Sequence, residues 1–158
     1  MSNKSCFFTG HRTVKITGEL LERLDSKLTE MINDGITDFY AGGAVGWDTI
    51  CAKRVLALKE KYPQIRFHLV LPCPPKQQTL KWNDDQKTEY DMILKSADDT
   101  RIVSKEYTND CMRNRNARLV ELGDICICYY NEKDKRSGTG QTVRMAEKAG
   151  KTVINMYR

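Results

Sequence analysis

Short apolar runs alternate along the chain with longer segments in which apolar residues recur every three or four positions. The runs are typical of buried strands, and the three- and four-residue spacing is typical of one face of a helix. The runs predict strands at Ser5–Thr9, Asp38–Ala41, Arg66–Leu71, Arg101–Val103, Ile125–Tyr130 and Thr152–Met156. The spaced segments predict helices at Glu19–Asn33, Thr49–Tyr62, Asp84–Ala97, Asp110–Leu122 and Gln141–Ala149.

This alternation of strands and helices indicates βαβ units, whose right-handed crossovers place helices on both faces of a parallel sheet. We therefore expect an α/β fold: a Rossmann-like, doubly wound, mostly parallel sheet flanked by helices on both faces. No repeat or linker divides the sequence, so residues 1–158 are expected to form one domain. Residues 72–82 are the one long irregular stretch.

Composition supports a globular chain. Hydrophobic residues make up 40% and charged residues 30% of the 158 residues, which excludes a disordered or collagen-like protein. No apolar run approaches the roughly 20 residues of a membrane span, and the start of the chain, Met1–Lys4, is polar. We therefore expect a cytoplasmic protein with no membrane partner.

The six cysteines do not suggest a disulfide scaffold or a zinc site. Four of them, Cys6, Cys51, Cys126 and Cys128, lie inside apolar segments, which favours reduced and buried thiols. The close pair Cys126 and Cys128 has the spacing of a strand rather than that of a CxxC ligand pair. We expect no metal site and no required cofactor.

The net charge of +5 is mild, and it is spread over helix faces with alternating Lys and Glu. Such a charge permits an anionic ligand. The sequence has no basic groove with interleaved aromatic residues, which argues against nucleic acid as a partner.

Candidate chemistry lies in the loops that follow the strands, because doubly wound sheets bind ligands at the carboxyl ends of their strands. The first such loop holds Thr9, Gly10, His11 and Arg12. The glycine allows close approach of a ligand, and the other residues offer a hydroxyl, an imidazole and a fixed positive charge suited to phosphate. The alternative is that Gly10 only turns the chain and Arg12 is solvated.

The loop after the second strand is rich in small residues and leads directly into a helix: Gly42, Gly43, Ala44 and Gly46. Free backbone N–H groups at a helix start attract an anion. Asp48 follows in the first turn, where its carboxylate competes for the same donors. Two roles stay open for Asp48: capping the helix, or accepting hydrogen bonds from ribose hydroxyls.

A second glycine-rich helix start carries Ser137, Gly138 and Thr139, with Thr142 one turn further on. It follows the fifth predicted strand, so it should lie on the same edge of the sheet as the first. The pair of glycine-rich starts at one edge favours a nucleotide-type ligand.

Three further residues complete the expected binding set. Arg115 is placed to reach along the sheet edge, with Asn116 beside it; the alternative for Arg115 is a salt bridge to Glu121 or a neighbour. Trp82 either stacks on a base or closes a loop onto the domain.

Taken together, FFTGHR at 7–12, GGAVGWD at 42–48, LPCP at 71–74, the segment from Met112 to Val120 and SGT at 137–139 resemble the YpsA-like branch of the SLOG superfamily. That superfamily also includes the DNA-processing protein DprA/Smf and the LOG phosphoribohydrolases. The resemblance covers almost the whole chain. It implies a Rossmann-like fold, a site for a nucleotide or nucleotide-derived ligand, and a homodimer.

The resemblance to the LOG hydrolases is incomplete. Met112 and Arg115 match the arginine motif of that branch, but Thr142 stands where its catalytic glutamate should be. A threonine cannot act as a carboxylate general base. Asp48 or Asp124 could replace the missing group, and His11 could act as a general acid.

We therefore expect binding or sensing of a nucleotide or nucleotide-derived ligand at the carboxyl edge of the sheet. One alternative is hydrolysis of a nucleotide N-glycosidic bond, with Arg115, Asp48 or His11 as atypical catalytic residues. The other is single-stranded DNA binding, as in DprA.

Overall fold

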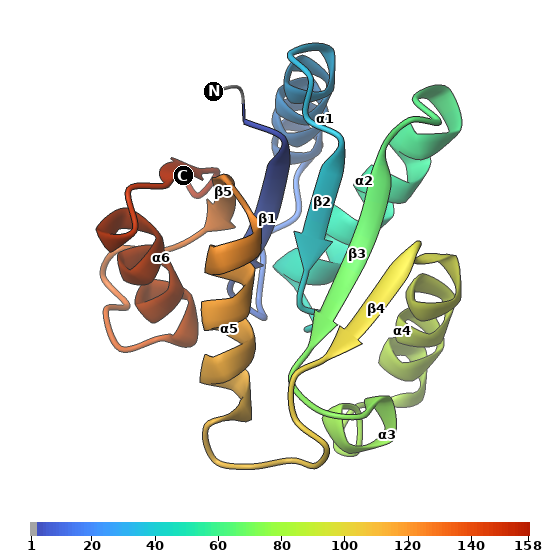
Figure 1. The fold of residues 1–158 in the computed structure, drawn as a ribbon, viewed down its shortest axis with the longest axis vertical. Helices are drawn as coiled ribbons and strands as arrows, with labels where there is room; N and C mark the ends of the chain where they lie inside the picture. The colour runs from blue at the N-terminus through green and yellow to red at the C-terminus, as the bar shows by residue number, and fades with distance from the viewer. Residues whose placement is uncertain (1–2) are drawn as a thin grey trace.

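In the computed structural model, which describes residues 3–158, six strands form one sheet between two layers of helices (Figure 1). Met1 and Ser2, part of the polar start, lie outside the described residues. The strands are β1 Ser5–Gly10, β2 Asp38–Ala41, β3 Arg66–Leu71, β4 Asp99–Ile102, β5 Ile125–Tyr129 and β6 Thr152–Asn155. The helices are α1 Gly18–Asn33, α2 Trp47–Lys61, α3 Pro75–Gln78, α4 Asp84–Ser96, α5 Cys111–Leu122 and α6 Gly138–Lys148.

The sheet has the order β4-β3-β2-β1-β5-β6, and every pair of neighbouring strands is parallel. The chain adds strands outward from β1 to β4 and then returns to the other side of β1 with β5. Strand order therefore reverses between β1 and β5, which is where a doubly wound sheet opens a crevice for a ligand. The predicted Rossmann-like fold is confirmed.

Helices cover both faces of the sheet, as the alternation of elements predicts. Helices α1, α2 and α4 lie behind the sheet in Figure 1, and α5 and α6 lie in front of it. Strand β1 contributes side chains to the hydrophobic cores on both faces of the sheet, because Phe8 packs in the core behind the sheet and Phe7 in the core in front of it. A strand buried on both faces reads as a continuous apolar run, which is why its sequence showed it clearly.

Strand β4 begins two residues before the predicted start, at Asp99 rather than Arg101. It is one of the two edge strands, and its residues are half-buried or exposed, so apolar residues do not mark where it begins. Polar contacts fix its position instead: Asp99 Oδ2 accepts from Arg101 Nε at 2.9 Å and lies 3.3 Å from Nδ1 of His68 on β3.

The irregular stretch after β3 contains the short helix α3, and it contacts the loop after β2 and helix α4. Gln78 is its anchor: its Nε2 donates to the Gly42 carbonyl at 3.3 Å, and its Oε1 accepts from the Tyr90 hydroxyl at 2.8 Å. Trp82 packs edge-to-face on Tyr90, with ring centroids 5.3 Å apart.

All six cysteines are buried and none forms a disulfide. Between residues 3 and 158, no group of three or more His, Cys, Asp or Glu side chains is arranged to hold a metal ion. In the same part of the chain, no helix combines the length and the hydropathy needed to cross a bilayer.

Candidate functional site

A cavity of about 390 Å³ opens at the carboxyl ends of β1 and β5, where the strand order reverses. We call it the edge cavity. Its walls come from the end of β1, the loop before α2, one face of α5 and the start of α6. The lining residues are Phe8, Thr9, Gly10, His11, Arg12, Ala44, Asp48, Met112, Arg115, Asn116, Leu119, Ser137, Gly138 and Thr139. The fold thus brings together eleven of the sixteen residues that the sequence suggests for ligand binding.

Contacts within the protein use two backbone donors at the start of α2. The backbone N–H of Trp47 donates to the His11 carbonyl at 3.2 Å, and that of Ala44 donates to Asp48 Oδ2 at 3.2 Å. Gly46 has a φ of 84°, and a Cβ there would overlap the carbonyl oxygen of Arg12. The first glycine-rich loop therefore packs the β1 loop tightly against α2.

Asp48 is 6% exposed and is the one carboxylate among the described residues that line the edge cavity. Burial raises its pKa to about 6, although the nearby Arg115 guanidinium and the backbone N–H groups of Ala44 and Gly42 favour the ionised form. A carboxyl group with this pKa exchanges its proton near neutrality and can accept a hydrogen bond from a sugar hydroxyl.

Arg115 is held rigidly beside Asp48. It is 5% exposed; its Nη1 donates to the Gly42 carbonyl and its Nε donates to Asn116 Oδ1 at 2.8 Å. A Cβ at Gly42 would overlap the guanidinium, so a side chain there would displace Arg115 from this position. The predicted alternative, a bond from Arg115 to Glu121, does not form, because Glu121 pairs with Arg118 at 2.7 Å.

Arg115 forms no ion pair with any carboxylate of residues 3–158. Burial lowers its pKa, and the charge of Asp48 opposes that shift. A buried guanidinium without a directly bonded carboxylate makes the electrostatic potential of the cavity favourable for an anion.

The start of α6 is open. Ser137 caps it: its Oγ accepts from the Gly140 N–H at 3.0 Å. Gly138 and Thr139 line the edge cavity, and their N–H groups have no hydrogen-bond partner within the described chain. Free N–H groups in the first turn of a helix form an anion site.

Two hydroxyls add to these donors. Thr9 and Thr139 are each 7% exposed and line the edge cavity, and no side-chain hydrogen bond engages either hydroxyl among residues 3–158. Neither hydroxyl oxygen is among the buried, unpartnered atoms of the described chain, so both are accessible to a ligand in the cavity.

His11 and Arg12 occupy the mouth of the cavity. His11 Nε2 accepts from the Asn131 N–H at 2.9 Å, which places the ring proton on Nδ1. The imidazole is therefore oriented by the β5–α6 loop. Arg12 is exposed and has no ion pair with another described residue.

Five of the suggested residues do not line the edge cavity. Three of them are glycines of the loop after β2, and they lie next to other parts of the protein rather than in the cavity wall: Gly42, Gly43 and Gly46. Trp82 lies against Tyr90 instead. Thr142 is fully buried, and its hydroxyl donates to the Gly138 carbonyl at 2.9 Å.

Asp124, considered as a substitute carboxylate, lies at the opposite edge of the sheet. It precedes β5, and its Oδ2 accepts from the N–H of Lys4 at 2.9 Å and the hydroxyl of Ser5 at 3.1 Å. These bonds hold the start of β1 in place. The hydrogen bond from the Lys4 backbone N–H contributes most to lowering the pKa of Asp124. Its role is structural.

Sequence reasoning missed three apolar lining residues, Phe8, Met112 and Leu119. Met112 and Leu119 lie on the same helix face as Arg115, at separations of three and four residues. That spacing is the signal that could have found them.

Relatives and solved structures agree with this architecture. The chain is 28% identical over 143 residues to the SPbeta prophage-derived protein YoqJ of Bacillus subtilis, covering 80% of this chain and 81% of YoqJ. It is 26% identical over 135 residues to a UPF0398 protein of Bacillus cereus, covering 84% of this chain and 72% of the relative.

The chain also resembles the structure of DNA processing protein A from Helicobacter pylori, a single-stranded DNA-binding protein, with a TM-score of 0.66 and 17% identity. The likeness covers 98% of this chain and 65% of that one, so this chain spans less than two thirds of its neighbour. At this identity the likeness establishes the fold.

The prediction that nucleic acid is disfavoured as a partner is wrong, because a protein with this fold over nearly the whole chain binds single-stranded DNA. The prediction rested on net charge, which averages over the molecule and does not report where basic side chains gather. Exposed basic residues flank the open start of α6: Lys133, Lys135, Arg136 and Arg144.

The sequence match agrees with the fold and with the placement of the glycine-rich loops around one cavity. It spans residues 6–158, from the first buried strand to the end of the chain. This chain belongs to the YspA SLOG family (YpsA).

Proposed function

We propose that the edge cavity binds a nucleotide or nucleotide-derived ligand, with its phosphate at the start of α6 and its sugar beside Asp48. The observation that carries the proposal is the pair of unpartnered N–H groups, of Gly138 and Thr139, in a cavity that also holds a buried arginine. These groups suit an anion, and few other ligands would satisfy them.

The two halves of the ligand meet different chemistry. The phosphate receives hydrogen bonds from the α6 start and from the Thr139 hydroxyl, with Arg12 at the mouth supplying charge. The sugar hydroxyls donate to Asp48, whose carboxylate is held in place by the Ala44 N–H. Arg115 uses Nη1 on the Gly42 carbonyl and Nε on Asn116, and it contributes its positive charge to the cavity.

Binding fits this cavity better than hydrolysis. Glycoside hydrolysis ordinarily uses two carboxyl groups, one on each side of the scissile bond. Asp48 is the one carboxylate that lines the described cavity, and the buried Thr142 hydroxyl is already bonded to a backbone carbonyl. The ligand is expected to leave the protein unchanged.

Calorimetric titration with AMP tests the proposal, with Thr139→Val as the probe variant. Removing this hydroxyl is expected to weaken AMP binding roughly tenfold, since a hydrogen bond to a charged group is worth about 1.5 kcal/mol or more. Thr142→Val is the matched control, because it removes a hydroxyl from the same helix outside the cavity. Equal affinity in both variants, or no AMP binding by the wild type, would overturn the assignment, and release of free adenine would point to hydrolysis.

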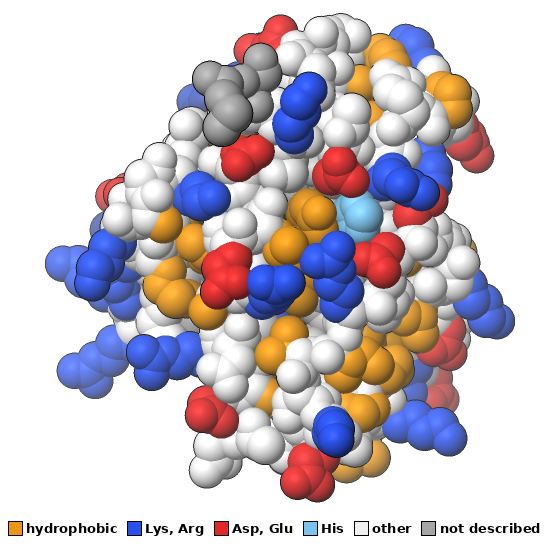
Figure 2. Space-filling view, in the orientation of Figure 1, with side chains coloured by type: hydrophobic (Ala, Val, Ile, Leu, Met, Phe, Trp, Pro, Cys, Tyr) orange, Lys and Arg blue, Asp and Glu red, His pale blue; other side chains and the backbone are white. Residues whose placement is uncertain are grey.

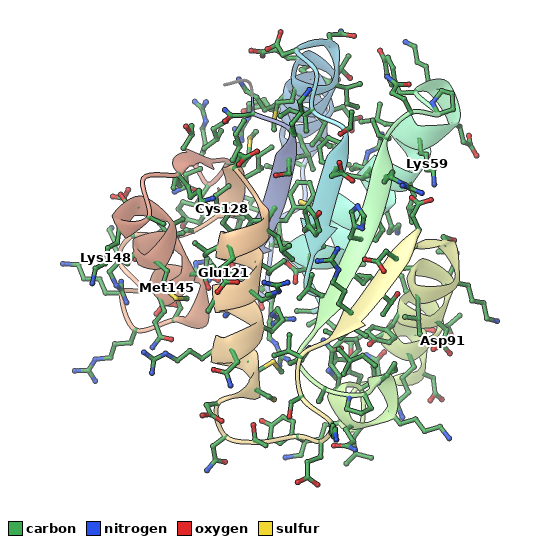
Figure 3. All side chains as sticks on the ribbon, viewed as in Figure 1. Lys59, Asp91, Glu121, Cys128, Met145 and Lys148 are labelled. Carbon is green, nitrogen blue, oxygen red and sulfur yellow. The ribbon has the colours of Figure 1, made fainter. Side chains whose placement is uncertain are left out.

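A second candidate function is single-stranded DNA binding. It is favoured by the fold likeness to a protein with that activity and by the exposed basic residues around α6. Figure 2 shows Lys and Arg side chains gathered on the α6 side of the front face, and Figure 3 shows Lys148 extending from α6 away from the sheet. A single DNA strand could place one nucleotide in the edge cavity, with its phosphate backbone along the α6 side of the molecule.

Titration with a single-stranded oligodeoxynucleotide at several salt concentrations tests the second candidate. Contact with the phosphates of a strand requires affinity to fall steeply as salt rises. Lys133→Gln combined with Arg144→Gln should reduce that dependence while AMP affinity is retained. Oligonucleotide affinity that equals AMP affinity and is insensitive to salt would reject DNA as the ligand.

A further inference from the structure

A second cavity, of about 510 Å³, lies on the far side of the wall formed by Arg12 and the loop before α2. We call it the apolar groove. It runs between the β1–α1 loop and the first turns of α2, and α4 closes its other side. Its surface is mainly aliphatic, from Val14, Ile16, Leu21, Val45 and Ile50. The volume falls in the range of small-molecule sites.

The charges around the apolar groove are not equivalent. Lys53 pairs with Glu89 at 3.1 Å, and Arg54 donates to both carboxylate oxygens of Asp25, at 2.8 and 2.6 Å. Arg12 has no such partner among residues 3–158. The free positive charge therefore lies at the wall that separates the groove from the edge cavity, because Arg12 lines both.

From the edge cavity to the apolar groove, the protein thus presents the proposed phosphate site at the α6 start, then the Arg12 cation, then the aliphatic surface of the groove. Ile16 is 61% exposed at the rim of the groove, although it is large and apolar. An exposed apolar patch beside an unpaired cation suits a ligand that carries a flat, poorly hydrated ring next to a phosphate.

We propose that the apolar groove holds the base of a second nucleoside, joined through its phosphate to the nucleotide in the edge cavity. The bridging phosphate then lies by Arg12, and the second base covers the aliphatic side chains. This inference rests on the proposed function. The chemistry is shared by a free dinucleotide and by the next nucleotide of a nucleic acid strand.

The test compares the affinities of AMP, diadenosine diphosphate and a short oligodeoxyadenylate for the wild type, Ile16→Gln and Met92→Gln. Met92 is a matched control, since it is 54% exposed on α4 and lines neither cavity. The wild type is expected to bind a two-nucleoside ligand at least tenfold more tightly than AMP. Ile16→Gln is expected to bind the two-nucleoside ligand roughly fivefold more weakly than the wild type, because it loses apolar contact, and to bind AMP as the wild type does. Met92→Gln is expected to bind all three ligands as the wild type does.

Each outcome decides the inference. A gain for diadenosine diphosphate that Ile16→Gln reduces supports a dinucleotide, and the same pattern for the oligodeoxyadenylate alone supports a nucleic acid strand. AMP binding without a gain for either longer ligand overturns the groove assignment and leaves the proposed function standing. A gain that Ile16→Gln leaves intact also overturns it. Failure of AMP and both longer ligands to bind overturns the proposed function itself.

Discussion

The two glycine-rich helix starts lie at the same edge of the sheet, but they use their backbone donors in different ways. At the start of α2, the donors of Trp47 and Ala44 are taken by the His11 carbonyl and the Asp48 carboxylate. At the start of α6, Ser137 caps one donor and leaves those of Gly138 and Thr139 free. The first start packs tightly against the β1 loop, although the N–H groups of Asp48 and Thr49 in its first turn have no partner among residues 3–158. The second start has free donors and no such close contact at its first glycine, so it has room for a ligand.

The glycines differ accordingly. A side chain at Gly46 would overlap the backbone of Arg12, whereas a Cβ at Gly138 would meet nothing within 4 Å. A glycine-rich loop before a helix therefore has two physical explanations, close approach of protein backbone or close approach of a ligand. The atoms that a Cβ at each glycine would meet separate these explanations.

The largest effect expected from this contrast is on stability at Gly46. Gly46→Ala places a side chain at a φ of 84° and against the Arg12 carbonyl, and should cost more than about 3 kcal/mol of the free energy of unfolding. Gly138→Ala is the control and should change stability by less than about 1 kcal/mol. Urea denaturation of both variants measures the difference; equal losses would remove the distinction between the two starts.

The next effect concerns Asp48 and pH. Its pKa rises from an ordinary 3.8 to about 6 on folding, so the folded state binds more protons between these values. Stability from this group is therefore lost as pH rises from about 4 to about 6, by on the order of 2 to 3 kcal/mol. Subtracting the unfolding free energy of Asp48→Asn from that of the wild type across this range isolates the effect. A difference that stays flat or rises with pH would contradict the burial of an ionisable carboxyl at the α2 start.

A smaller effect is expected on ligand affinity at the start of α6. Gly138→Pro deletes one free N–H at the first helical position, where proline is tolerated, and Ser137 has the extended backbone that a following proline needs. AMP affinity should fall about tenfold or more, while stability changes little. Gly138→Ala keeps the donor and should bind normally. Unchanged AMP affinity in the proline variant would place the phosphate elsewhere.

The smallest effect is expected for the cap of α6. Ser137→Ala removes the hydroxyl that accepts from the Gly140 N–H and should destabilise the protein by about 1 kcal/mol. Thermal unfolding measures the loss. Ser137→Asp, which can replace the cap, should restore stability but weaken AMP binding, because its charge repels phosphate. Restored stability with unchanged affinity would show that the phosphate does not approach the α6 start.

Much of this architecture could be read from local sequence. Strands buried on both faces appear as apolar runs, so β1, β3 and β5 were predicted almost to the residue. The predicted start of edge strand β4 was two residues too late, because the position of this strand depends on polar contacts between Asp99, Arg101 and His68 rather than on apolar burial. The site residues nearest to the strand ends were also found, since parallel strands bring their carboxyl ends together.

Hydrophobic periodicity and strand-to-loop order are local properties, so they are enough to predict the doubly wound fold, the edge of the sheet where the candidate site lies and most of the residues around it. Contacts across the fold decide which of two similar glycine-rich loops packs against the β1 loop and which has open space at its first glycine. They also decide that Arg115 is fixed by Gly42 rather than paired with Glu121, and that Trp82 lies away from the edge cavity. Those outcomes depend on which groups meet across the fold, and distances between residues remote in sequence are set by packing.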